Sequence, residues 1–336
     1  TGARRRAALE AIQSGAPLVI GTHALMQEGV SFARLGLAIV DEQHRFGVHQ
    51  RLALVDKAGV ESRHAHQLIM TATPIPRTLA MTAYAGLETS VIDELPPGRK
   101  PVTTVVISDE RRGEVIRRVA AACNEGRQAY WVCTLIEESD AVQAQAAEDV
   151  ARELQSDLAG TGVGLVHGRM KAVEKQETMD RFKSGEIQLL VATTVIEVGV
   201  DVPNASLMII ENAERLGLAQ LHQLRGRVGR GAEQSSCVLL YSQPVGPLAR
   251  ERLNILRETN DGFRIAEKDL ELRGPGEVLG TRQTGMLQFR VADLARDQGL
   301  LDLIPEVAGR LLDENPDLVR RLVRRWIGDA DRYAAV

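Results

Sequence analysis

Two adjacent carboxylates at the end of an apolar run are the first candidates for chemistry in this sequence. Asp41 and Glu42 directly follow LGLAIV, a run typical of a buried strand in a parallel sheet. Open parallel sheets place ligand sites at the carboxyl ends of their strands. Asp41 suits coordination of a phosphate-bound Mg²⁺ ion, and Glu42 suits orientation of a water that attacks a phosphoryl group. The pair predicts metal-assisted phosphoryl transfer, with a solvated turn as the alternative.

Threonines follow two further apolar runs. Thr71 and Thr73 begin TATPIPRTLA, where their hydroxyls can hydrogen-bond toward the acidic pair. Thr193 and Thr194 end a strand in LLVATTVIEVGVDVP, which also carries Asp201. Hydroxyls at a strand end can bind a nucleic-acid phosphate, and a carboxylate can accept a hydrogen bond from a ribose hydroxyl. Rigid turns explain either segment taken alone.

The segment QLHQLRGRVGRG offers cationic groups that suit the same chemistry. Gln220, Gln223, Arg227 and Arg230 are spaced three, four and three residues apart, which predicts that all four project from one side of a helix. Arginines presented together can stabilise the negative charge of a phosphoryl-transfer transition state, an effect worth roughly 10³ to 10⁵ in rate.

The elements that must position these residues alternate between short β-branched runs and longer helix-like segments, which predicts an α/β fold with parallel sheets. The expected strands are 16–20, 35–40, 67–73, 102–107, 128–134, 162–167, 187–194, 206–211 and 237–242. Later residues read as a helical hairpin broken at Asn260, Asp261 and Gly262, followed by C-terminal helices.

Paired prolines and a glycine in ELPPGRKP indicate a linker between two lobes. The first lobe has too few expected strands for a complete sheet, and the sequence has no initiator Met, so we expect the chain to begin partway through a larger protein. The expected divisions are 1–95 for the first lobe, 96–101 for the linker, 102–245 for the second lobe, 246–290 for the helical hairpin and its loop, and 291–336 for the C-terminal helices.

Composition narrows the classes of protein. The 336 residues are 44% hydrophobic, which excludes general disorder, and aromatic residues at 3% leave little for base stacking. Lys and Arg number 41 against 45 Asp and Glu, so a polyanion must meet local basic patches. The three cysteines lack the CxxC spacing of a metal site, and each lies in or beside an apolar stretch, which predicts buried thiols. They are Cys123, Cys133 and Cys237. No run of 18 apolar residues occurs, so we expect a cytoplasmic protein without a membrane partner.

Five motifs in order carry a resemblance to a known family. DEQH, TATPIPRTLA, VHGRM, TTVIEVGVDVP and QxxGRxGR resemble motifs II to VI of superfamily 2 helicases. DEQHRFGVHQRLAL and NDGFRIAEKDLELRGPGEVLGTRQTG are similar to the RecG branch-migration helicases. The resemblance implies two RecA-like lobes, the first incomplete, then a helical hairpin and C-terminal helices. It also implies an ATP-dependent motor that uses Mg²⁺ and remodels stalled forks and Holliday junctions.

The same resemblance implies roles for individual residues, with Asp41 as the Mg²⁺ ligand, Asp201 at the cleft, and Thr71 and Thr73 linking the nucleotide site to DNA movement. Residues implied at the nucleotide are Asp41, Glu42, Thr71, Thr73, Asp201, Gln223, Arg227 and Arg230. Residues implied in DNA contact or translocation are Thr22, His23, Thr193, Thr194, Arg252, Arg273 and Gln283. The implied partners are branched double-stranded DNA and single-stranded DNA-binding protein, and the implied state is a monomer.

The sequence departs from the family pattern in one respect that concerns activity. No GxxxxGK[ST] phosphate-binding loop occurs, and the family's N-terminal wedge domain has no counterpart here. We therefore expect the chain to carry part of the ATP site and to be inactive as an ATPase by itself.

Three alternative functions remain open at this point. The motor of a transcription-repair coupling factor shares DEQH and a similar hairpin motif. A DNA-binding module without ATPase activity would bind DNA regardless of nucleotide. A metallohydrolase could use Asp41, Glu42 and His44, although the other histidines show no ligand spacing that supports it.

Overall fold

The computed structural model describes residues 2–27, 29–42, 65–71, 88–134, 140–193, 202–231, 233–273 and 297–327. The chain divides into two compact units, one formed by residues 1–89 and 273–336 and the other by residues 90–272. Each unit combines helices with parallel strands, which confirms the predicted α/β class.

The first unit begins with α1 (Gly2–Gln13), which carries three consecutive arginines at residues 4–6, and a short 3₁₀ helix η1 (His23–Met26). Its strands β1 (Leu37–Val40) and β2 (His66–Ile69) run parallel, with Val40 opposite Ile69. Because both strands end at the same edge, the residues that follow them lie beside each other.

The prediction of a strand at residues 16–20 is wrong. This segment adopts no regular structure, and Leu18 and Ile20 are 76% and 87% exposed. A strand is defined by hydrogen bonds to a neighbour, and no strand in the described part of the chain pairs with this segment. Short apolar runs do not reveal from hydropathy alone whether such a neighbour exists.

The C-terminal part of the first unit is helical, as expected. It comprises η5 (Gln298–Leu303), α11 (Ile304–Glu314) and α12 (Pro316–Ile327). The arginines of α12 are exposed, and Arg320 pairs with Asp317 at 3.0 Å at its surface. None of the described helices has the length and apolar content needed to cross a lipid bilayer.

The second unit is built on a six-stranded parallel sheet with strand order β3-β8-β7-β4-β6-β5. The strands are β3 (Thr103–Ser108), β4 (Gln128–Cys133), β5 (Val163–Val166), β6 (Leu189–Thr193), β7 (Ala205–Ile210) and β8 (Ser236–Tyr241). Every one of these strands overlaps a run for which the sequence predicts a strand, and β3, β7 and β8 each extend one residue beyond the predicted range. Residues of β4 and β6 are buried throughout, which is typical of central strands covered on both faces.

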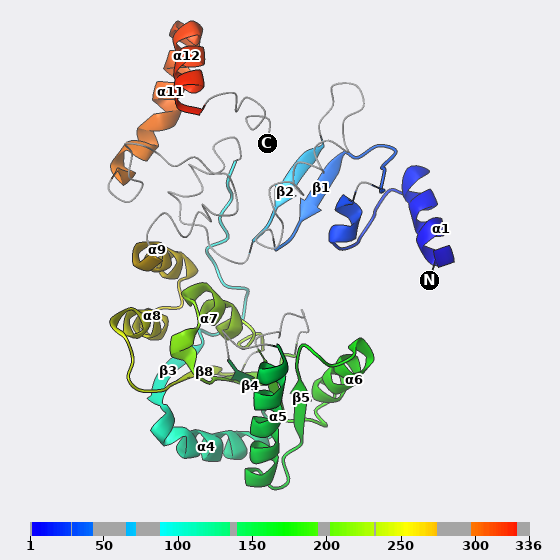
Figure 1. Ribbon diagram of the computed structural model, residues 1–336, viewed down its shortest axis with the longest axis vertical. Coiled ribbons are helices and arrows are strands. Elements are labelled where there is room, and N and C mark those ends of the chain that lie inside the picture. The colour runs from blue at the N-terminus through cyan, green and yellow to red at the C-terminus, as the bar shows by residue number, and fades with distance from the viewer. Residues whose placement is uncertain are drawn as a thin grey trace. The chain divides into compact units, whose positions relative to one another are not determined.

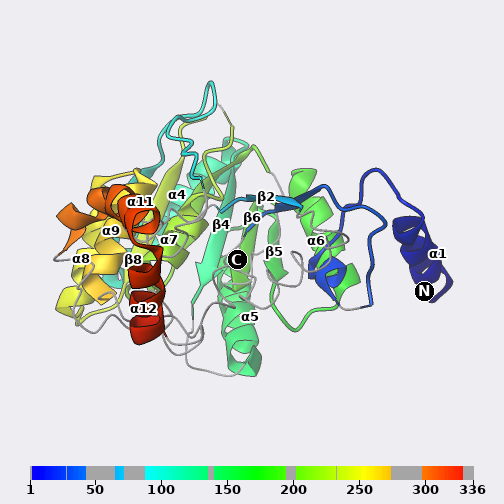
Figure 2. The same cartoon turned by 90° about the horizontal axis from the view of Figure 1, so that it is seen from above.

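Helices cover both faces of this sheet, as Figure 1 shows for α7 and α8 on one side of β3 and β8 and α4 on the other. Strands β4, β6 and β5 lie side by side in Figure 2, in agreement with their pairing. One face carries α4 (Arg112–Asn124) and α5 (Asp140–Asp157). The other carries α6 (Ala172–Lys183), α7 (Leu218–Arg225) and α8 (Pro247–Glu258). Helix α9 (Gly262–Arg273) follows α8, which confirms the expected helical hairpin.

The core alternates between these two faces along β4. Tyr130 packs toward α6, where its ring lies 5.1 Å from that of Phe182, and Trp131 packs toward α4 and α5. The three cysteines are buried, as expected, and burial raises the pKa of the Cys123 thiol to about 11. These thiols are therefore protonated at neutral pH.

A pair of substitutions on α6 tests this packing. Phe182 is fully buried, so Phe182→Ala should lower the free energy of unfolding by about 3 to 5 kcal/mol through lost burial and a cavity. Val173 lies on the same helix and is 67% exposed, so Val173→Ala should change it by less than about 0.5 kcal/mol. Urea denaturation of the chain measures both. Equal effects of the two substitutions would contradict the assigned core.

Candidate functional site

The acidic pair lies where the sequence predicts, directly after β1. Asp41 is exposed, and its Oδ1 accepts a hydrogen bond from the Glu42 backbone N–H at 2.8 Å. Glu42 has a φ of 55°, a left-handed conformation that is uncommon for a residue with a side chain. Such backbone strain is found more often at functional sites than elsewhere. The arrangement presents the Asp41 carboxylate to solvent while Glu42 is half-buried.

The hydroxyl and histidine candidates of the first unit occupy two places. Thr71 follows β2, which pairs with β1, so it lies at the same sheet edge as the acidic pair. Thr22 caps η1, where its Oγ1 accepts from the Ala24 backbone N–H at 3.5 Å, and His23 is exposed in the first turn. Thr73 lies outside the described residues.

The arginine segment of the second unit is a loop rather than the continuous helix predicted from its spacing. Helix α7 ends at Arg225, and Gly226 closes it with its backbone N–H bonded to the His222 carbonyl at 3.0 Å. Arg227 and Arg230 therefore follow the helix. The regular spacing predicted a helix that is too long, because such spacing is compatible with a helix but does not show where the helical backbone hydrogen bonds end.

One hydrogen bond and the close approach of two glycine backbones constrain this loop, which we call the arginine loop (residues 226–230). Gly229 has a φ of +79°, and a Cβ on it would lie 2.8 Å from Val102 Cγ2. The Arg99 Nε donates to the Gly229 carbonyl at 3.0 Å. A Cβ on the following Gly231 would lie 2.5 Å from the Pro203 carbonyl oxygen. Gly229 is thus required by its left-handed backbone and by close approach, and Gly231 by close approach alone.

The two glutamines of this segment differ in role. Gln220 bonds its own helix start, since its Oε1 accepts from the Gly217 backbone N–H at 3.0 Å. The prediction that it projects together with the arginines is therefore wrong, because a helix N-terminus competes for its side chain. Gln223 is half-buried on α7, one turn before the arginine loop.

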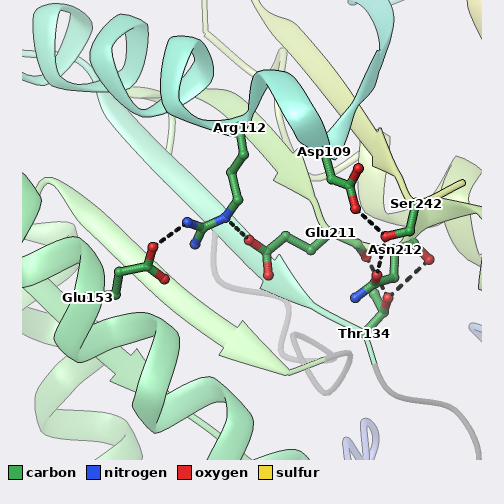
Figure 3. Close-up of polar contacts among 7 residues, drawn as sticks. All are labelled: Asp109, Arg112, Thr134, Glu153, Glu211, Asn212 and Ser242. Atoms are coloured by element: carbon green, nitrogen blue, oxygen red, sulfur yellow. Dashed lines mark hydrogen bonds and ion pairs between the residues drawn. The ribbon is translucent and has the colours of Figure 1, made fainter.

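A network of charged residues joins the carboxyl ends of the second sheet to its helices (Figure 3). Arg112, at the start of α4, donates to Glu211 and to Glu153, each at 2.6 Å, and its guanidinium lies 5.2 Å from the Trp131 ring centroid. Burial lowers the pKa of Arg112, but hydrogen bonds and charges of the two glutamates outweigh it and raise this pKa. Arg112 therefore fixes Glu211, the residue that follows β7.

The same edge holds a second set of hydrogen bonds beside a cavity of about 280 Å³. The Ser242 hydroxyl bonds Asp109 Oδ2 at 2.6 Å and Asn212 Oδ1 at 3.2 Å (Figure 3). The Thr134 hydroxyl donates to the Glu211 carbonyl at 2.5 Å. These contacts fix the segment that runs from β7 into α7, and thus the approach to the arginine loop.

The remaining candidates are distributed as follows. Thr193 is the last residue of β6 and is 3% exposed. Arg252, on α8, donates from Nη2 to the Glu214 carbonyl at 3.0 Å. Arg273 is the last residue of α9. Thr194, Asp201 and Gln283 lie outside the described residues.

Sequence reasoning missed two arginines that act on this region. Arg99 lies in the segment read as a linker, and Arg225 lies between the residues singled out on α7. Arg225 is 3% exposed. Its position one residue before a glycine gave no separate signal, because the burial of a charged residue follows from partners distant in sequence.

Two family models match the chain. The helicase conserved C-terminal domain matches residues 113–232, and domain 3, C-terminal, of the ATP-dependent DNA helicase RecG matches residues 259–322. The first match contains the arginine loop, and the second begins at the corner between α8 and α9.

Curated relatives match over the whole chain. The ATP-dependent DNA helicase RecG of Escherichia coli K12 is 64% identical over 335 residues, covering 99% of this chain and 48% of the relative. That of Pasteurella multocida is 62% identical, covering 100% and 49%. That of Bacillus subtilis is 47% identical, covering 93% and 45%. The chain spans about half the length of the curated relatives it matches.

Solved structures of helicases are also similar to this chain. A structure of RecG bound to a three-way DNA junction is 44% identical and superposes with a TM-score of 0.65, covering 90% of this chain and 38% of that one. The helicase Lhr of Mycobacterium smegmatis, bound to single-stranded DNA and AMP-PNP, is 18% identical with a TM-score of 0.51, covering 76% and 36%. The second likeness concerns the fold alone.

Adjacent arginines provide a matched test of the charged network. Arg112→Met should lower the free energy of unfolding of the second unit by about 1 to 3 kcal/mol, because Glu211, at 14% exposure, loses its cation. Arg111→Met removes a pair with Glu114 in which both side chains are well exposed, so it should leave this free energy nearly unchanged. Urea denaturation measures both variants, and a larger loss for Arg111→Met would refute this account.

Proposed function

Since the chain belongs to the RecG family of helicases, we propose that it supplies the second half of an ATP-driven motor that remodels branched DNA. The observation that carries the proposal is the arginine loop, held after α7 by Arg99 and by the positive φ of Gly229. It lies within the segment similar to the helicase C-terminal domain. The natural substrates of this motor would be stalled replication forks and Holliday junctions. Its direct partner would be branched double-stranded DNA.

The acidic pair is proposed to prepare the hydrolysis step. Mg²⁺ is a hard ion that keeps several waters and binds proteins through one or two carboxylates, and the exposed Asp41 carboxylate fits such binding. When bound, the ion would neutralise charge on the nucleotide phosphates. Glu42 would orient the attacking water and accept its proton.

We propose that arginine side chains of the second unit act on the phosphoryl group that the water attacks. Arg227 and Arg230 would stabilise negative charge that spreads over the phosphoryl oxygens in the transition state, with Gln223 binding the nucleotide and Asp201 near it. A fixed loop suits this role, because donors that are already in place lose little entropy when the charge develops. Thr71 and Thr73 would link hydrolysis at this nucleotide site to movement of DNA.

DNA contacts are proposed for residues at strand ends and in the hairpin. Thr22, His23, Thr193 and Thr194 offer hydroxyl and imidazole groups suited to phosphate, which carries no base sequence. Arg252, Arg273 and Gln283 are proposed to move duplex DNA. We also propose a monomer in the bacterial cytoplasm that meets single-stranded DNA-binding protein at forks.

ATP hydrolysis by two proteins tests the motor and the incomplete ATP site together. One is the 336-residue chain, and the other, called the extended protein, has the N-terminal half of the Escherichia coli relative before it. We expect hydrolysis only by the extended protein and stimulation of it by forked DNA, because no GxxxxGK[ST] loop occurs in this chain.

Two results would contradict this expectation. Hydrolysis by the 336-residue chain at a comparable rate would place the phosphate-binding groups within it. Salt-sensitive DNA binding by the extended protein, without any nucleotide dependence, would favour the DNA-binding module instead.

An arginine substitution tests the second unit's part in hydrolysis. In the extended protein, Arg227→Gln should lower kcat for ATP by about 10³ or more, since a transition-state cation is removed. Arg117→Gln, at an exposed position on α4, is the matched control and should leave kcat unchanged. A rise in KM with an unaltered kcat for Arg227→Gln would show that this residue only binds the nucleotide.

A further inference from the structure

Arg225 is a cation buried at the end of α7. Among the described residues no carboxylate forms an ion pair with it. Its Nη1 donates to the carbonyl oxygens of Leu256 at 2.8 Å and Thr259 at 2.9 Å, and to Thr104 Oγ1 at 3.3 Å. Its Nη2 donates to His222 Nδ1 at 3.0 Å. The guanidinium is thus held by acceptors from three separate elements.

The carbonyls that bind Arg225 belong to the C-terminal end of α8. Leu256 lies in the last turn of this helix, and Thr259 is the residue that caps it. Carbonyls at a helix C-terminus have no partner within the helix and carry the negative end of its dipole. Burial lowers the pKa of Arg225, but an arginine side chain remains charged in proteins. The contact is therefore charge-assisted.

His222 is adapted to this cation. Burial, followed by the charge of Arg225, lowers the pKa of His222 to about 4. The imidazole is therefore neutral at physiological pH, and its Nδ1 lone pair can accept from the guanidinium. A protonated His222 would repel Arg225, so the two groups form a consistent pair.

Arg225 lies between two segments with different proposed tasks. The arginine loop begins at the next residue, Gly226. On the other side, Thr259 starts the corner between α8 and α9, where its Oγ1 accepts from the Asp261 backbone N–H at 3.0 Å. Asp261 Oδ1 in turn accepts from the Phe263 backbone N–H at 2.8 Å and so caps α9. One side chain therefore joins the arginine loop to the corner of the hairpin.

We propose that Arg225 is a positioning residue that couples the arginine loop to the α8–α9 hairpin. This inference rests on the proposed motor function, in which the loop responds to the nucleotide and the hairpin moves DNA. A planar guanidinium held by acceptors on several sides allows little displacement before hydrogen bonds break. A shift of the loop is therefore transmitted to the C-terminal end of α8.

The test compares ATP hydrolysis with DNA unwinding in the extended protein. Arg225→Lys keeps the charge but loses the planar fork, and Arg225→Met loses both. We expect both variants to retain DNA-stimulated ATP hydrolysis to within about threefold and to unwind at least about tenfold less forked DNA per ATP hydrolysed. Thr104→Val, which removes a single acceptor, should lower the same ratio less. Arg118→Met, at an exposed position on α4, should leave both rates unchanged.

Two outcomes would overturn the proposal, and a third would overturn the proposed function on which it rests. Equal losses of hydrolysis and unwinding in Arg225→Lys and Thr104→Val would indicate a structural role only. An unchanged ratio in Arg225→Lys and Arg225→Met would show that the contact does not couple the two segments. Absence of DNA-stimulated hydrolysis in the unsubstituted extended protein would instead mark failure of the proposed function itself. The thermal unfolding midpoint of each variant separates loss of fold from loss of coupling.

Discussion

Parallel strand direction is the constraint on which the second unit depends. Since all strands of its sheet run the same way, the residues that follow them gather at one edge. Asp109 and Ser242 are bonded there across a separation of 133 residues, and Arg112 joins Glu211 from 99 residues away. Strand pairing brings these segments together, so no additional long-range contact is needed to assemble this edge.

The sequence predicts such a sheet well because its central strands are buried on both faces. A strand such as β4, buried at every residue from Gln128 to Cys133, must be almost continuously apolar, and the printed sequence shows that directly. The same reasoning located Asp41 and Glu42 at a strand end. It failed at residues 16–20, where apolar character occurs without a neighbouring strand in the described part of the chain.

The parts that could not be predicted depend on backbone hydrogen bonds and on partners far along the chain. The spacing of Gln220, Gln223, Arg227 and Arg230 fits a helix, yet α7 ends at Arg225. Where a helix ends is decided within one turn, and a glycine permits several outcomes there. The burial of Arg225 follows from carbonyls 31 and 34 residues later, which no local pattern reveals.

The type of acceptor that binds each arginine determines how displacements pass between the elements that it joins. Arg112 is held by carboxylates, and a glutamate side chain can follow a displaced guanidinium by changing its rotamer. Such a pair tolerates small shifts between its elements. Arg225 is held by backbone carbonyls, which cannot move unless the end of α8 moves with them. A buried cation bound to a helix terminus therefore transmits displacement between elements, whereas a cation bound to flexible carboxylates absorbs part of it.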